Sequence, residues 1–183
     1  MKQNLFGLSI QAISEAVGAY GLKPFRGRQI AKAIYQRFVT DFSEMTDLSK
    51  EDRALLSEHF SIEAPQLERE IVSKDQKTCK VLLQLIDGAC VETVLMRQPY
   101  GNSLCISTQV GCAMGCLFCA STLKGLERDL TVGEIIGQIW FMQRLLAKTE
   151  EKVDTVVVMG TGEPLQNYDS LLAAIRLCHD KDV

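Results

Sequence analysis

The sequence predicts an α/β fold in three segments, which differ in pattern along the 183 residues. Residues 1–66 space their apolar side chains as helices do, which predicts a small helical domain. Residues 67–100 alternate as strands do and contain the turn sequence Asp87-Gly88, which predicts a short β-hairpin segment. Residues 101–183 follow the order strand, helix, strand, helix, which is typical of a right-handed parallel α/β unit.

Three helices are expected in the helical domain. Ser9 is the expected N-cap of the first helix, and Gly21 is its expected end. A second helix is expected from about Arg28, and a third follows Ser49, which forms a variant capping box with Asp52. Their apolar stripes are Ile10, Ile13, Val17 and Tyr20 in the first, Ile30, Ile34 and Phe38 in the second, and Leu55, Leu56 and Phe60 in the third.

Strands and helices alternate in the rest of the chain. Strands are expected at residues 70–72, 79–86 and 90–95, with a further extended stretch over residues 103–110. Thr131 and Glu134 form a capping box for a helix that runs to about Ala147.

The last βα unit starts with a strand at residues 153–159. Its second half, Val156 to Met159, is wholly apolar, which is typical of a strand buried in a parallel sheet. Asn167 is the expected cap of the helix that follows.

The composition is that of an ordinary globular protein, with 46% hydrophobic and 23% charged residues. No run approaches the roughly 18 apolar residues of a membrane span, and polar residues interrupt the amino terminus, unlike a signal peptide. No membrane partner is therefore expected. The chain has seven cysteines, and because free thiolates need a reducing compartment, a cytoplasmic location is expected.

The net charge of −3 does not indicate a nucleic-acid binder, but the charge is unevenly placed. Residues 20–40 contain five basic and no acidic side chains, whereas residues 41–70 contain nine acidic and three basic ones. Such asymmetry can mark a phosphate-contacting face, and its ordinary explanation is a solvated helix face.

Three thiols lie close together in a glycine-punctuated stretch, as Cys112, Cys116 and Cys119 at Cys-x3-Cys-x2-Cys spacing. Thiolates are the usual holders of iron–sulfur clusters, and three ligands for a four-iron cluster leave one iron open. A zinc site that adds Cys105 is the alternative, although structural zinc sites usually pair their ligands in two Cys-x2-Cys knuckles and no second knuckle is present. The odd number of cysteines, seven, disfavours a disulfide framework.

A second motif follows the strand predicted at residues 153–159, as Gly160-Thr161-Gly162-Glu163-Pro164. Glycines at the carboxyl end of a parallel strand let the backbone approach a ligand, and barrel enzymes place their chemistry at that end. A glycine-rich turn is a weak signal by itself, and Glu163 alone is equally a solvent-exposed turn acid. The position of the motif, one βα unit after the cysteines, strengthens the interpretation as a binding site.

Together the two motifs resemble those of the radical S-adenosylmethionine (SAM) enzymes. In that family three cysteines hold a [4Fe-4S] cluster, SAM chelates the open iron, and an electron from the cluster breaks a C–S bond to give a 5′-deoxyadenosyl radical. The resemblance implies that Cys112, Cys116 and Cys119 hold the cluster. It also implies that Gly162 and Glu163 bind the amino group of SAM, for which an acidic acceptor is suited.

Three blocks narrow the resemblance to the radical SAM RNA adenine-C2 methyltransferases: residues 104–112, 130–135 and 162–167. Residues 25–30 resemble that family's RNA-facing helical domain, and residues 91–94 resemble the strand before its barrel. Leu165 after Glu163-Pro164 favours the C2 enzymes over their C8-methylating relative. There are three alternatives. The first is this C8-methylating relative, the second is a different radical SAM enzyme such as a glycyl-radical activase, and the third is a zinc-dependent RNA-binding module.

The resemblance implies methylation of an adenine in 23S ribosomal RNA and in tRNA, with a flavodoxin-like electron donor. A first SAM methylates a carrier cysteine, the radical takes a hydrogen from that methyl, and the carbon radical adds to C2. Glu92 is expected to be the base that removes the C2 proton, and Cys105 the resolving thiol that closes a disulfide with the carrier. By residue chemistry alone, both would be ordinary strand side chains.

The chain departs from this family in its length. The carrier cysteine of the family lies near the carboxyl terminus, whereas this chain ends at Val183 after two βα units. A complete barrel needs roughly 200 residues or more. The chain is therefore expected to be the amino-terminal part of a methyltransferase, with the first two βα units of an incomplete radical SAM barrel, and to be inactive alone.

Overall fold

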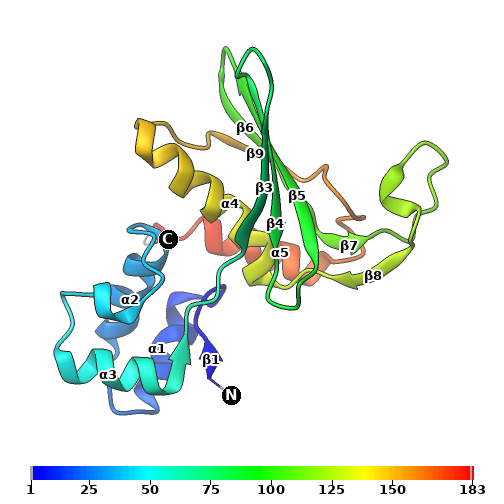
Figure 1. The fold of residues 1–183 in the computed structure, drawn as a ribbon. Coiled ribbons are helices and arrows are strands. Elements are labelled where there is room, and N and C mark those ends of the chain that lie inside the picture. Colours follow the sequence, from blue (N-terminus) through cyan, green and yellow to red (C-terminus); the bar gives the residue numbers. More distant parts are fainter. Residues whose placement is uncertain (1, 182) are drawn as a thin grey trace. The chain divides into compact units, whose positions relative to one another are not determined.

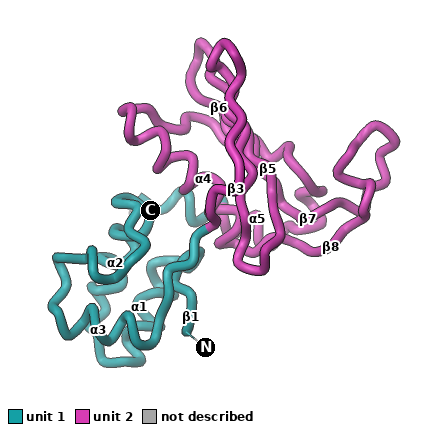
Figure 2. The backbone as a smooth tube through the Cα atoms, in the orientation of Figure 1, with its two compact units in different colours: residues 1–64, 175–183 teal, residues 65–174 magenta. Residues whose placement is uncertain are grey.

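The computed structural model describes residues 2–181 and 183, and its backbone groups into two compact units (Figures 1 and 2). One unit contains residues 1–64 and 175–183, and the other contains residues 65–174. The predicted hairpin segment and the cysteine stretch thus fall within one unit. No helix in the described part of the chain is long and apolar enough to cross a membrane.

The helical unit contains α1 (Ile10–Gly18), α2 (Phe25–Tyr35) and α3 (Lys50–His59), with a short 3-10 turn η1 (Phe42–Glu44). Ser9 caps α1 by accepting the Ala12 N–H, and Ser49 caps α3 by accepting the Asp52 N–H, so both predicted starts are confirmed. The stripes are buried at Ile13 and Val17 of α1 and at Ile30 and Ile34 of α2. Tyr20 lies beyond the end of α1, which comes at Gly18 and not at the predicted Gly21, and it is 45% exposed. Strand β1 (Gln3–Asn4) pairs in parallel with β2 (Phe60–Ser61).

Helix α2 begins earlier than predicted, at Phe25 instead of about Arg28. Pro24 precedes it with helical backbone angles, and proline is pre-organised for the start of a helix. The helix also ends sooner, at Tyr35, so the apolar stripe loses Phe38, whose φ of +57° lies outside the helical region.

The second unit is built on a five-stranded sheet in the order β3-β4-β5-β6-β9. Strands β3 (Gln66–Val72), β4 (Thr78–Gln84), β5 (Cys90–Gln98) and β6 (Gly101–Cys105) are antiparallel neighbours, and β9 (Thr155–Val157) pairs in parallel with β6. Gly88 adopts a φ of +86° in the predicted turn between β4 and β5. The chain crosses from β6 to β9 through α4 (Val132–Leu146) and continues into α5 (Tyr168–Cys178). The predicted strand–helix–strand–helix order is confirmed.

One face of this sheet is buried and the other is more open. The side chains of Val81, Leu83, Val91, Thr93, Leu95 and Leu104 alternate onto the buried face. Helix α4 lies against this face, since the Thr93 hydroxyl donates to Gln138 Oε1 over 2.9 Å. Thr131 and Glu134 form the predicted capping box at the start of α4.

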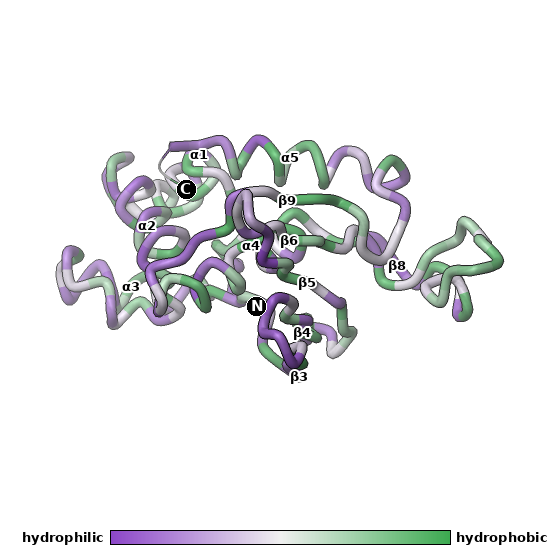
Figure 3. Tube along the Cα trace, turned by 90° about the horizontal axis from the view of Figure 1, so that it is seen from above, coloured by the Kyte–Doolittle hydropathy of each residue, from purple (hydrophilic) through white to green (hydrophobic). Residues whose placement is uncertain are grey.

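Strand β9 differs from the prediction of a buried strand. Only residues 155–157 pair, Val156 is 37% exposed and Met159 is 80% exposed. In the part of the chain that the structure describes, β9 has a neighbouring strand on one side only. Its side chains therefore stay accessible to solvent, although this segment is hydrophobic (Figure 3). A short sheet of β7 (Gln109–Gly111) and β8 (Leu126–Asp129) was not predicted.

Candidate functional site

The two predicted motifs meet where β6 and β9 end. Because these strands are parallel neighbours, their carboxyl ends lie at the same edge of the sheet. The backbone N–H groups of Thr108 and Gln109 both donate to Thr161 O, over 2.9 and 3.2 Å, and the Gly160 N–H donates to Ile106 O over 3.0 Å. Backbone hydrogen bonds therefore join the segment that leads into the cysteines directly to the glycine-rich loop.

Ser107 joins this edge to the neighbouring strand. Its buried hydroxyl donates to Glu92 O over 2.8 Å and accepts the Thr161 N–H over 3.0 Å. The side-chain amide of Gln138, also buried, accepts the Ser107 N–H over 2.8 Å and donates to Ser107 O over 2.9 Å. Every polar atom of Ser107 thus has a partner, which holds the strand end rigidly.

The cysteine stretch leaves the sheet between β7 and β8. We call residues 112–125 the cysteine loop. Its base is closed by the Cys112 N–H, which donates to Gly125 O over 3.1 Å. Cys112 is buried, Cys116 is exposed and Cys119 is half-buried. Among the described residues, no three His, Cys, Asp or Glu side chains are gathered closely enough to hold a metal ion.

The chemistry of this loop nevertheless suits a thiolate-ligated metal group. The Ser121 hydroxyl and the Ser121 and Thr122 N–H groups point at Cys119 and hold the pKa of its thiol below the usual value. The thiolate is the species that binds metals, and soft thiolates suit iron–sulfur clusters. The loop also exposes apolar side chains, with Leu117 and Phe118 almost fully accessible.

The glycine-rich loop is shaped by close packing. Gly162 has a φ of +107°, and a Cβ at this position would lie 2.6 Å from Gln109 Cβ. Glu163 is half-buried, and its Oε1 accepts the Leu165 N–H over 3.0 Å. A carboxylate has several acceptor positions, so Glu163 retains capacity to accept from an ammonium group.

Replacing Gly162 with alanine is expected to destabilise the second unit by about 1–3 kcal/mol, since the new methyl group would clash with Gln109 in a backbone conformation that alanine disfavours. Denaturant unfolding measures the effect. Gly18→Ala is the control because Gly18 has open space around its Cβ position, and a change of no more than about 1 kcal/mol is expected there. Equal stability of the Gly162 variant and the parent would contradict the close approach.

The structure brings Glu92 and Cys105 onto the same face of the sheet. Cys105 lies directly opposite Val94, and residues two apart on a strand share a face, so Glu92 is diagonal to Cys105. This is the more open face: the Glu92 side chain is 53% exposed and Cys105 is half-buried. Lys80 Nζ pairs with Glu92 Oε1 at 2.9 Å. Cys105 ends strand β6 and is paired there on both sides, with Val94 of β5 and Val157 of β9.

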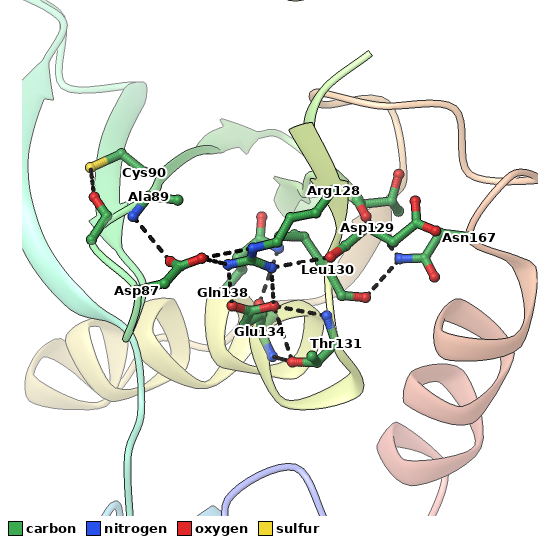
Figure 4. A network of polar contacts seen from close by, with 12 residues as sticks. Asp87, Ala89, Cys90, Arg128, Asp129, Leu130, Thr131, Glu134, Gln138 and Asn167 are labelled. Carbon is green, nitrogen blue, oxygen red and sulfur yellow. Dashed lines mark hydrogen bonds and ion pairs between the residues drawn. The ribbon is translucent and has the colours of Figure 1, made fainter. Parts of the chain in front are cut away.

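A polar network holds the return strand of the cysteine loop, and the sequence did not reveal it (Figure 4). Arg128 on β8 donates to Asp87 Oδ2 over 2.7 Å and to both carboxylate oxygens of Glu134 over 2.8 and 2.9 Å. These bonds raise the pKa of the Arg128 guanidinium. Asn167, predicted as a helix cap, donates its side-chain amide to Thr108 O and Leu130 O over 2.8 and 2.7 Å. The sequence indicated the Thr131-x2-Glu134 box, the Asp87-Gly88 turn and Asn167 as separate local features, but not the bonds described here.

Comparisons with known proteins agree with this arrangement. A family model described as "Ribosomal RNA large subunit methyltransferase N-terminal domain" matches residues 3–62. A protein of Geobacillus thermodenitrificans named "Probable dual-specificity RNA methyltransferase RlmN" is 48% identical over 95% of this chain. One of the same name from Bacillus licheniformis is 44% identical over 98%. The chain is thus similar to the RlmN proteins.

A solved structure also resembles this chain. A radical SAM methyltransferase from Sphaerobacter thermophilus superposes with a TM-score of 0.92 and is 36% identical, over 98% of this chain and 53% of that one. The α/β fold is thus that of a radical SAM methyltransferase. The chain spans about half the length of these relatives, 48% of the Geobacillus protein and 50% of the Bacillus protein.

Proposed function

We propose that this chain is the cofactor-binding part of a radical SAM RNA methyltransferase that methylates C2 of adenine in 23S ribosomal RNA and tRNA. The supporting observation is the joining of the cysteine loop, the Gly162-Glu163 turn and the Glu92 strand through the segment 107–109. The names of the relatives support RNA as the substrate. In this proposal β6 and β9 are the first two strands of a barrel, and residues 1–66 are the RNA-facing domain.

The cofactors are assigned to the two loops. Cys112, Cys116 and Cys119 would hold a [4Fe-4S] cluster, and Glu163, with the close backbone at Gly162, would bind the amino group of SAM. A bound cluster of this kind supplies the electron that cleaves SAM to a radical, and a flavodoxin-like donor would restore it. The lowered pKa of Cys119 favours the ligating thiolate.

Glu92 and Cys105 would act on the methylated base. The methyl group reaches C2 from a carrier cysteine elsewhere in the full enzyme, and Glu92 accepts the C2 proton. The adduct would give one electron back to the cluster. The Cys105 thiolate would then attack the carrier sulfur, so that the carbon–sulfur bond breaks and its electron pair stays on the methylene carbon, which takes a proton and becomes the methyl group, while a disulfide remains. Both side chains lie on the more open face of the sheet, where a base could approach them. Such thiol chemistry fits a reducing, cytoplasmic location.

Mass spectrometry of RNA tests this function. A full-length enzyme carrying this chain, expressed in a host that lacks its own adenine-C2 methyltransferase, should restore 2-methyladenosine to both 23S ribosomal RNA and tRNA. Glu92→Gln in the same enzyme should abolish the modification. Appearance of 8-methyladenosine instead would assign the chain to the C8 relative, and unmodified RNA from a folded, cluster-containing enzyme would contradict the proposal.

A further inference from the structure

We propose that Gln109 is a positioning residue that fixes Glu163 relative to the base of the cysteine loop, and so determines where the amino group of SAM binds. The inference rests on the proposed function, in which Glu163 receives that amino group. It concerns a residue that the cofactor motifs themselves do not include.

The side chain of Gln109 bridges the two loops. It is fully buried, its Oε1 accepts the Glu163 N–H over 2.9 Å, and its Nε2 donates to Asp129 Oδ1 over 2.7 Å. Glu163 follows β9, whereas Asp129 ends β8, the strand that returns from the cysteine loop. One amide group therefore spans the distance between the two predicted cofactor sites.

The partners determine how the Gln109 amide is oriented. A backbone N–H can only donate and an ionised carboxylate can only accept, so the oxygen must face Glu163 and the nitrogen must face Asp129. Arg128, next to Asp129, directs its guanidinium to Asp87 and Glu134 and contacts only the backbone oxygen of Asp129, over 3.1 Å. A reversed amide would leave buried groups unpaired, which is costly.

Close packing against Gln109 also restricts the backbone of the Gly162-Glu163 turn. Gly162 rests against Gln109 so closely that a Cβ there would lie 2.6 Å from Gln109 Cβ and 2.8 Å from its Cγ. The backbone of Gln109 is paired with Asp129 in the β7–β8 ladder, and Cys112 follows three residues later in the chain. The Gly162-Glu163 turn thus lies on a side chain whose own backbone leads into the cysteine loop.

Three variants and a control separate this role from a merely structural one. Gln109→Met keeps the length and removes both hydrogen bonds. Gln109→Glu keeps an acceptor for the Glu163 N–H but sets two carboxylates against each other at Asp129. Gln109→Glu combined with Asp129→Asn restores a donor–acceptor pair of reversed polarity. Gln98→Met, at an exposed position at the end of β5, is the control.

Two measurements are made on each variant. Amide hydrogen exchange at Glu163, followed by NMR in the cofactor-free chain, should be about tenfold faster in Gln109→Met, because the acceptor is lost. SAM affinity, measured by equilibrium binding to the anaerobically reconstituted chain, should fall about tenfold in Gln109→Met and Gln109→Glu. The double variant should return to within about threefold of the parent, and Gln98→Met should match the parent.

The outcomes distinguish this inference from the proposed function. If the parent chain takes up a cluster and binds SAM, but Gln109→Glu binds SAM equally well, the positioning role of Gln109 is wrong and the proposed function stands. If Gln109→Glu weakens SAM binding and the addition of Asp129→Asn does not restore it, the positioning role of Gln109 is also wrong. Should Gln109→Met not fold, Gln109→Glu and its rescue decide the matter. If the parent itself does not bind SAM, the proposed function fails first.

Discussion

Cys119→Ala in a reconstituted full-length enzyme carrying this chain should abolish SAM cleavage, with a loss of more than about 100-fold. Changes to groups that merely support a metal ligand cost about 10- to 100-fold in affinity or activity, and loss of a ligand itself costs more. Cys119 is the thiol whose surroundings favour the thiolate, since Ser121 and Thr122 direct donors at it. The measurement is 5′-deoxyadenosine produced per chain with a chemical reductant, together with iron content.

The control for this substitution is Cys90→Ala. Cys90 is an exposed thiol of the same unit, but it starts β5 and lies outside the cysteine loop. This variant should keep its iron and cleave SAM at the parent rate. If Cys119→Ala retained cleavage while Cys90→Ala lost it, the assignment of the cluster to the cysteine loop would be wrong.

Cys105→Ala in a full-length enzyme carrying this chain should trap the methylated RNA on the protein. Without a resolving thiol, the bond between the carrier cysteine and the base is not broken, because no thiolate is available to form the disulfide. Denaturing gel electrophoresis should show a protein–RNA adduct that survives denaturation, and nuclease digestion with mass spectrometry should locate it on a cysteine. The released product should fall by more than about tenfold, as expected for loss of a covalent-catalysis partner.

The position of Cys105 supports this expectation. It is half-buried on the same face as Glu92, whereas Cys79 is buried on the opposite face. Cys90→Ala again serves as the control, and it should release product normally. Free methylated RNA at the parent yield from Cys105→Ala would remove Cys105 from the mechanism.

Local signals in the sequence predicted much of the fold. Ser9, Ser49 and the Thr131–Glu134 box each act within three residues, so the helix starts they mark were confirmed in the structure. Asp87-Gly88 likewise determined a tight turn from two residues. The start of α2 was predicted less well, because its buried apolar stripe begins at Ile30, whereas the helix begins at Phe25, whose side chain is exposed.

Features that depend on distant parts of the chain were not predictable in the same way. The exposure of β9 depends on which strands flank it, and an apolar run is the same in the middle and at the end of a sheet. The bonds of Gln138 to Thr93 and of Arg128 to Asp87 connect residues 45 and 41 positions apart. No spacing rule covers such pairs.

In the candidate site, too, the local motifs were predictable from the sequence and the contacts between distant residues were not. The cysteine loop and the Gly162-Glu163 turn are contiguous motifs, so the sequence was enough to single them out. That Glu92 and Cys105 share a face depends on the β5–β6 register, which places Cys105 opposite Val94. The role of Gln109 depends on hydrogen bonds to residues 20 and 54 positions away.

Electron paramagnetic resonance of the reconstituted chain tests the central claim most directly. After anaerobic incubation with iron and sulfide, the chain should be brown and hold about four iron atoms, and its reduced spectrum should change when SAM is added. Cluster uptake should be lost on replacing Cys112, Cys116 and Cys119 together. A colourless chain that binds zinc in place of iron, or a cluster whose spectrum is indifferent to SAM, would contradict the assignment.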